Sequence, residues 1–214
     1  MKERPVIFNS EMVRAILNGR KTQTRRVMKP QPEPCYRGGH WWPSNAFKTM
    51  LHIEEQMQNG QGGWKGLAGD ACPFGQVGDQ LWVRETFRLF DEDKECDCID
   101  FPCNCPPHGT PIYRASNDDI ESKWTPAIHM PRKDCRLLLE ITAVRVERLN
   151  DISEEDARAE GVAPSQHIIT PPEALYRVGF LNLWQSIYGA ENWSANPWVW
   201  VIEFKHVEVR DASK

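Results

Sequence analysis

Residues 136–149 read RLLLEITAVRVERL and form the longest strand candidate in the chain. Apolar and polar side chains alternate over much of this stretch, as they do in a strand with one buried face. The alternation changes phase near 142–144, and such a change predicts a β-bulge, in which one extra residue bends the strand. We therefore expect a long, bent strand at the centre of the fold.

Further strands and helices are predicted on both sides of this stretch. Residues 78–90, GDQLWVRETFRLF, and residues 198–209, WVWVIEFKHVEV, alternate in the same way and are predicted strands. Helices are expected at 11–18, 154–160 and 173–188, the first two with N-capping side chains and terminal glycines. The last helix is predicted to carry one apolar stripe, made of Leu175, Val178, Leu181, Trp184 and Tyr188.

The order of these elements is α-β-β-α-α-β, and the strands need a common sheet. This order favours an α+β fold, with a small closed β-barrel, flanking short helices and irregular insertions. The chain has 214 residues, enough to bury a real core, and we expect a single domain over 1–214. The insertions are predicted at about 30–75, 90–125 and 163–180, where the periodicity is interrupted.

The charge balance limits the classes of partner. The chain has 26 basic and 30 acidic residues, a formal charge of −4. This balance argues against a protein that coats long duplexes, so any nucleic-acid contact is expected to be local. No run approaches the roughly 18 apolar residues of a membrane span, and the N-terminal residues show no apolar signal segment. We expect a cytoplasmic protein without a membrane partner.

The segment GRKTQTRR at 19–26 is the densest group of polar side chains. Four basic residues and two threonines follow directly after a helix that ends in glycine. A lysine beside a threonine can lower the cost of forming an alkoxide, as a neutral base or as a cation. The competing interpretation is a solvated basic turn.

Three other residues are weaker candidates. Glu160 stands at the end of the predicted second helix, where an exposed carboxylate is the ordinary interpretation. Glu85 lies on the same strand face as apolar residues, so it needs a cationic partner if that face is interior. An arginine from the 19–26 segment is a plausible partner, and contact with a substrate is an equal alternative. Among nine tryptophans, Trp124 is our candidate for stacking on a base.

The cysteines suggest a metal site. Cys96, Cys98, Cys103 and Cys105 form a C-x-C-x4-C-x-C pattern with His108 close behind. Four thiolates in one loop complete a tetrahedron, which predicts a structural zinc and no catalytic one. The alternative is a cluster of free or redox-paired thiols. The chain lacks the motifs of serine hydrolases, P-loop proteins and dinucleotide-binding proteins.

The segment GRKTQTRR resembles the G-x-K-x-x-x-x-R signature of ASCH domains, which belong to the PUA-like superfamily. GDQLWV, the stretch from ITAVRVERL to AEGV, and WVIEF fall in the family order. The chain is similar to small bacterial ASCH enzymes that hydrolyse N4-acetylcytidine, and to longer phage and prophage ASCH proteins. The enzymes use a lysine, a threonine three residues later and a distant glutamate in an A-x-x-E pattern. Lys21, Thr24 and Glu160 occupy these positions.

The resemblance implies an amidohydrolase that acts on N4-acylated cytosine nucleosides without a catalytic cofactor. Thr24 is then the nucleophile, Lys21 its activator, and Glu160 orients the lysine and shuttles a proton. The expected substrate-binding residues are Arg20, Arg25, Arg26, Glu85 and Trp124. Two alternatives remain open: a module that binds a short single-stranded RNA without turnover, and a ribonuclease that uses the same cleft.

Overall fold

The computed structural model describes residues 1–58, 61–96, 98, 104–117 and 122–207. Its centre is a curved five-stranded sheet in the order β1-β6-β9-β10-β2. Strands β1 and β6 pair in parallel, and the other neighbours are antiparallel. The strands are β1 (Glu3–Ile7), β6 (Gln80–Arg84), β9 (Leu138–Arg148), β10 (Trp198–Val207) and β2 (Gln23–Val27).

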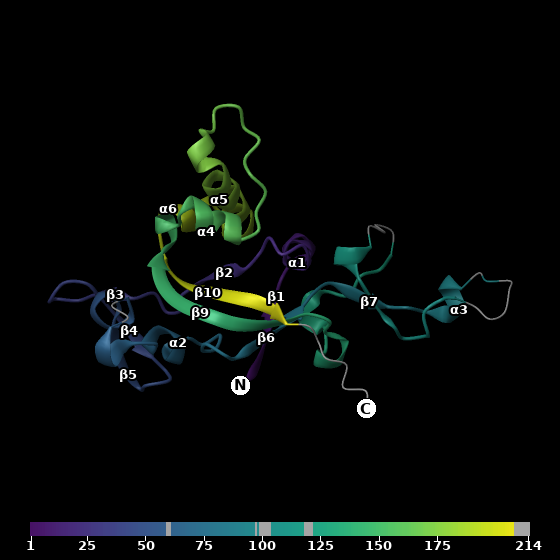
Figure 1. Ribbon diagram of the computed structural model, residues 1–214, viewed down its shortest axis with the longest axis horizontal. Coiled ribbons are helices and arrows are strands. Elements are labelled where there is room, and N and C mark those ends of the chain that lie inside the picture. The colour runs from purple at the N-terminus through teal and green to yellow at the C-terminus, as the bar shows by residue number, and fades with distance from the viewer. Residues whose placement is uncertain (59–60, 97, 99–103, 118–121, 208–214) are drawn as a thin grey trace.

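The two longest strands, β9 and β10, bend together (Figure 1). Their register shifts at one point, where Glu203 pairs with Ala143 and Phe204 pairs with Ile141. Thr142 is therefore the extra residue of a bulge, which confirms the bulge predicted from the change of phase. The bend turns the sheet around the buried side chains of its concave face.

The predicted closed barrel is not found among the described strands. Strands β1 and β2 are the two edges of the sheet, and no ladder of the described residues joins them. A side chain spans the gap between the edges, because the guanidinium of Arg26 on β2 donates to the carbonyl oxygen of Ile7 on β1 at 2.9 Å. The supported fold class is therefore mixed α/β with an open, curved sheet.

Strand β10 is buried on both faces and separates two apolar clusters. Trp200 and Ile202 belong to the larger cluster, together with residues of β6 and β9. Val199 and Val201 belong to the smaller one, with residues of α4 (Glu154–Ala159) and α5 (Leu175–Tyr188). Figure 1 shows these helices and α6 (Ala190–Ser194) together on one side of the sheet.

The two short helices begin and end as their sequences predict. Asn9 caps α1 (Ser10–Leu17) by accepting from the backbone N–H of Met12 at 2.8 Å. Ser153 caps α4 by accepting from the N–H of Asp156 at 3.0 Å. Gly161 ends α4 with φ +78, and a Cβ there would lie 2.6 Å from the Cβ of Lys21. This glycine therefore allows the end of α4 to approach the lysine.

The 30–75 insertion is more regular than its sequence suggests. It forms a small antiparallel sheet, followed by short helical turns. The elements are β3 (Glu33–Pro34), β4 (His40–Ser44), β5 (Thr49–His52), a π-helix (Ile53–Met57), a 3-10 turn (Gly62–Trp64) and α2 (Leu67–Ala71). Trp42 of β4 packs edge-on against Trp200, with ring centroids 5.3 Å apart, and so attaches the insertion to the main core.

The second insertion contains an arm, which we define as residues 87–117. A two-stranded ladder of β7 (Phe87–Leu89) and β8 (Pro111–Tyr113) forms its base, and α3 (Glu92–Glu95) lies in its tip. The arm projects away from the helices of the third insertion (Figure 1). Isolated 3-10 turns occur at Arg114–Ser116, Ala127–His129, Arg132–Asp134, Leu149–Asp151 and Pro172–Ala174. No helix in the described ranges is long and apolar enough to span a bilayer.

Candidate functional site

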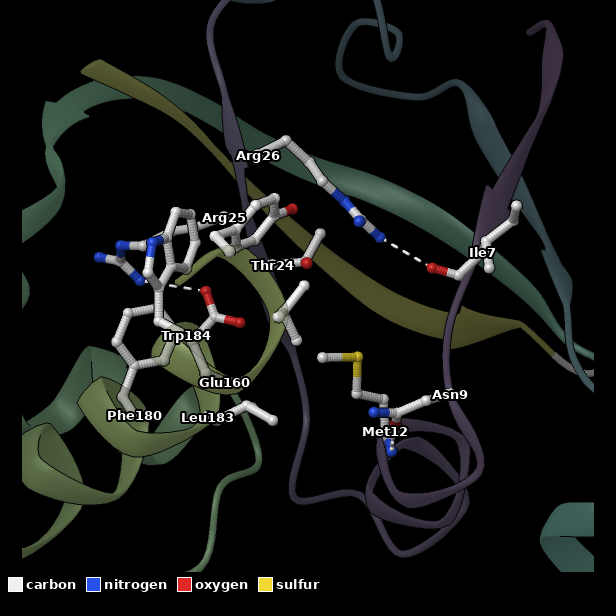
Figure 2. A pocket seen from close by; sticks show the side chains of 12 residues that line it. Ile7, Asn9, Met12, Thr24, Arg25, Arg26, Glu160, Phe180, Leu183 and Trp184 are labelled. Atoms are coloured by element: carbon white, nitrogen blue, oxygen red, sulfur yellow. Dashed lines mark hydrogen bonds and ion pairs between the residues drawn. The ribbon is translucent and has the colours of Figure 1, made fainter. Parts of the chain in front are cut away.

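A pocket of about 260 Å³ lies between the two edge strands, with α5 as one wall. Thr24, Arg25 and Arg26 of β2 line one side, together with Glu160 from the end of α4. The opposite side carries Ile7, Asn9 and Met12, and α5 supplies Phe180, Leu183, Trp184, Ile187 and Tyr188. Figure 2 shows that these side chains surround one space. Polar groups on one side and an apolar wall on the other are typical of a small-molecule site.

Lys21 is fully buried directly behind Glu160. Its Nζ donates to the Glu160 carboxylate at 2.8 Å, to the Glu160 backbone oxygen at 2.9 Å and to the Gln23 backbone oxygen at 2.8 Å. The side chain is 0% exposed. An ammonium has three N–H groups, and all three are engaged here. Lys21 therefore acts on the pocket through Glu160 and does not line it.

Burial lowers the pKa of Lys21, because a charged ammonium loses its hydration. The charge and hydrogen bond of Glu160 act in the opposite direction, and the nearby cations Arg26 and Arg25 lower the pKa further. The net direction is downward. Burial thus makes the charged form of Lys21 more costly here than in water, and Glu160 compensates part of that cost.

Glu160 also contacts a second buried cation. Its other oxygen accepts from Nη1 of Arg25 at 3.2 Å. Nη2 of Arg25 contacts Glu147 at 3.0 Å and Asp156 at 3.3 Å. Arg145 extends the network by pairing with Glu147, Asp156 and Glu203. Both terminal nitrogens of Arg25 are thus committed to carboxylates, so the geometry favours positioning of Glu160 over phosphate contact.

Thr24 contributes a hydroxyl group to the side of the pocket that β2 and Glu160 form. It pairs with Ile202 on β10, and the residue is 4% exposed. In Figure 2 its oxygen lies among the other lining groups, near Glu160. No hydrogen bond to this hydroxyl occurs within the described part of the chain. The structure therefore brings Thr24 and Glu160 to one pocket and holds Lys21 behind the carboxylate.

The aromatic wall was missed in the sequence. Phe180, Trp184 and Tyr188 follow one another at four-residue spacing on α5, with centroids 5.6 Å and 4.4 Å apart. The predicted stripe was right in burying Trp184, but it took Val178 and Leu181 in place of Phe180, which is the other buried residue of α5. A pattern of aromatics at i, i+4 and i+8 was the available signal.

The other predicted binding residues have separate positions. Arg26 lines the pocket, and its guanidinium lies 5.4 Å from the ring of Phe8. Arg20 is exposed and lines an adjoining groove. Glu85 is buried outside the pocket and pairs with Arg136 at 2.8 Å through both oxygens, so its partner is not an arginine of the 19–26 segment. Trp124 also lies outside, with Arg88 above its ring at 5.7 Å.

Three of the four predicted metal ligands lie together in the arm. The Sγ atoms of Cys96, Cys98 and Cys105 are all within 4.8 Å of one another, and this group could hold a metal ion. Cys103 lies outside the described residues. His108 is near the cluster in sequence, but its ring Nδ1 accepts from the backbone N–H of Glu92 at 3.4 Å.

The pocket has the parts of an acyl-transfer site: a hydroxyl, a carboxylate backed by a lysine, and a surface for a flat ring. Such a combination serves equally well to bind a base without turnover. In comparisons with known proteins, neither a family model nor a curated protein nor a solved structure matched the chain.

Proposed function

We propose that the chain is an ASCH-type amidohydrolase of the PUA-like superfamily that cleaves N4-acylated cytosine nucleosides. One observation carries the proposal. The Thr24 hydroxyl and the Glu160 carboxylate line the same pocket, and Lys21 holds that carboxylate from behind at 2.8 Å. The three residues are those that the resemblance to N4-acetylcytidine hydrolases selects, and Glu160 is far from the other two in sequence.

The wall of α5 suits a pyrimidine ring. Aromatic side chains stack on bases through their π faces, and Trp184 and Tyr188 provide such faces beside the polar groups. The side-chain amide of Asn9 and the guanidinium of Arg26 border the same space and can hydrogen-bond to ring or acyl oxygens. In this arrangement the ring stacks on α5, and the edge of the base faces Thr24.

The proposed reaction proceeds in two balanced steps. The Thr24 oxygen attacks the acyl carbonyl carbon, and the Glu160 carboxylate takes the hydroxyl proton. The carbon–N4 bond then breaks, the proton returns to N4, and cytidine leaves. Water attacks the acyl–threonine ester in the second step, which releases the carboxylic acid and restores the hydroxyl. Lys21 keeps the Glu160 carboxylate in place through its hydrogen bond at 2.8 Å.

The proposed reaction uses side chains and water alone. The arm projects away from α5 (Figure 1), and none of Cys96, Cys98 and Cys105 lines the pocket. A metal held by these thiols is therefore structural in this proposal.

A specific observation favours binding of a short single-stranded RNA as the second candidate. A groove of about 620 Å³ adjoins the pocket, shares Met12, Glu160 and Leu183 with it, and carries Arg14 and Arg20. Phosphates on either side of a recessed base would meet these arginines. The ribonuclease alternative has less support, because all three N–H groups of Lys21 are already engaged.

The deciding experiment uses the purified chain with N4-acetylcytidine, other acylcytosines and a short RNA. We expect release of cytidine from the acetylated nucleoside, measured by chromatography. Thr24→Val keeps the branched shape and should abolish turnover, a larger loss than the roughly 10²–10⁴-fold of a missing acid or base. Thr24→Ser retains a hydroxyl and should keep measurable activity. RNA binding without hydrolysis of any acylcytosine would instead establish the second candidate.

A further inference from the structure

The described residues at the tip of the arm form no apolar core. Between 91 and 110, none of the described side chains is buried. Hydrogen bonds between Phe90 and the 109–110 backbone close the base of the tip at 2.8 Å. Beyond them, ion pairs such as Lys94–Asp91 lie at the surface, where they stabilise little. Burial alone therefore does not offset the entropy of ordering this segment.

Three thiols lie close together in the tip of the arm. Cys96 follows directly after α3, and Cys105 lies on the chain that returns to β8. Cys98 lies between them, with its Sγ 3.4 Å from that of Cys105. All three sulfurs are within 4.8 Å of one another. Two thiolates bound to one tetrahedral zinc, with Zn–S near 2.3 Å, have sulfurs about 3.8 Å apart. The Cys98–Cys105 separation of 3.4 Å is close to that value, and the other two sulfur pairs are within 4.8 Å.

We propose that Cys96, Cys98 and Cys105 bind one Zn²⁺ that fixes the tip of the arm. Thiolates select zinc or other soft metals over magnesium and calcium. The fourth position belongs to a ligand beyond these three. The metal stabilises the tip by joining the end of α3 to the chain segment that returns to β8, a role that an apolar core would otherwise have. This role is independent of the reaction proposed for the pocket, since none of these thiols lines it.

The test measures zinc per chain in protein purified with a phosphine reductant and no chelator. We expect about one zinc in the wild type, as for a structural thiolate site. Cys96→Ser and Cys105→Ser should each lose most of it. Cys135→Ser is the matched control, because Cys135 lies outside the cluster and donates to the backbone oxygen of Leu137. It should keep its zinc.

A second measurement does not depend on the serine variants folding. Cobalt added to metal-free wild type should give thiolate-to-metal charge-transfer bands. Removal of zinc should speed hydrogen exchange in the arm and leave β9 and β10 protected. The proposal is overturned if the reduced chain holds no stoichiometric zinc and gives no cobalt spectrum. It is equally overturned if fresh protein contains a Cys98–Cys105 disulfide, or if the serine variants retain the metal.

Discussion

At the scale of single residues, the buried Lys21 shows how the site depends on complete pairing. Its three donors meet one carboxylate oxygen and two backbone oxygens, and Arg25 holds the other carboxylate oxygen. Each buried charge is thereby compensated, which is the condition for leaving it out of water. Removal of one member leaves the others without their partner.

The first residue-scale prediction concerns the stability of this group. Lys21→Met keeps the length of the side chain and leaves Glu160 with one cation instead of two. We expect the free energy of unfolding in urea to fall by about 3–5 kcal/mol, the usual cost of breaking a buried ion pair. Lys29→Met, at an exposed lysine, is the control and should change it by less than about 0.5 kcal/mol. A cost for Lys21→Met as small as that of the control would contradict the pairing.

The second residue-scale prediction concerns how stability depends on pH through Asp156. Burial raises the pKa of Asp156, but the charges of Arg25 and Arg145 lower it more, so the net shift is downward from 3.8. The folded state therefore favours the ionised form. Its stabilising contribution is full above pH 3.8 and is lost as the pH falls through the lower, folded-state pKa. Asp156→Asn should thus cost stability at neutral pH, and its difference from wild type should shrink in acid. A difference that stays constant from neutral pH into acid would rule this out.

At the scale of elements, α5 provides a wall for the pocket and part of the second core. Phe180 and Trp184 are buried, whereas Tyr188 is 38% exposed at the mouth. Trp184 is fixed by its indole N–H, which donates to Asn192 of α6 at 2.9 Å. Tyr188 is consequently the residue in which contact with a ligand can be tested with least damage to packing.

Tyr188→Leu should weaken substrate binding. Stacking on a base contributes about 1–3 kcal/mol, so we expect KM to rise roughly five- to 150-fold with a smaller change in kcat. Tyr176→Leu is the matched control, because Tyr176 is on the same helix but does not line the pocket. Equal KM values for the two variants would remove α5 from the binding site.

Local patterns predicted the elements well, and long-range contacts limited the rest. The last strand and the bulge at Thr142 follow from alternation, which is a property of neighbouring residues. The strand predicted over 78–90 is divided into β6 and β7, which belong to different sheets. The pairing of Glu85 with Arg136 joins residues 51 positions apart, and no local pattern selects that arginine. Likewise, closure of the sheet depends on whether β1 meets β2, and side chains of α1 and α5 lie around that gap. The family resemblance selected Lys21 and Glu160, which are in contact in the structure. It did not select the aromatic wall of α5.

At the scale of the whole molecule, the insertions differ in how they are attached. The 30–75 insertion shares the main core through Trp42, which is 3% exposed and contacts Trp200. No described side chain between 91 and 110 is buried to serve as such an anchor for the tip of the arm. The 30–75 insertion should therefore unfold together with the sheet, and the tip of the arm should be able to open separately.

Trp42→Ala tests this attachment. We expect a loss of about 3–5 kcal/mol in the free energy of unfolding, because a large buried side chain leaves a cavity. Trp64→Ala is the control in the same insertion, where the indole is 42% exposed, and should cost much less. Urea denaturation followed by circular dichroism measures both. A small loss for Trp42→Ala would mean that the insertion is only loosely joined.

The pairing order of the sheet also fixes when the pocket can exist during synthesis. Strand β1 can pair only after β6, about 75 residues later, has been synthesised. Strand β2 likewise depends on β10, its strand partner. Both sides of the pocket are therefore made early, but neither side is in place until its distant partner has emerged from the ribosome. Thr24 pairs with Ile202, so the proposed nucleophile reaches its position only after residue 202 has been synthesised. A nascent chain stalled before residue 198 would carry the side chains of Lys21, Thr24 and Glu160 and still have no β10 to hold Thr24 in place.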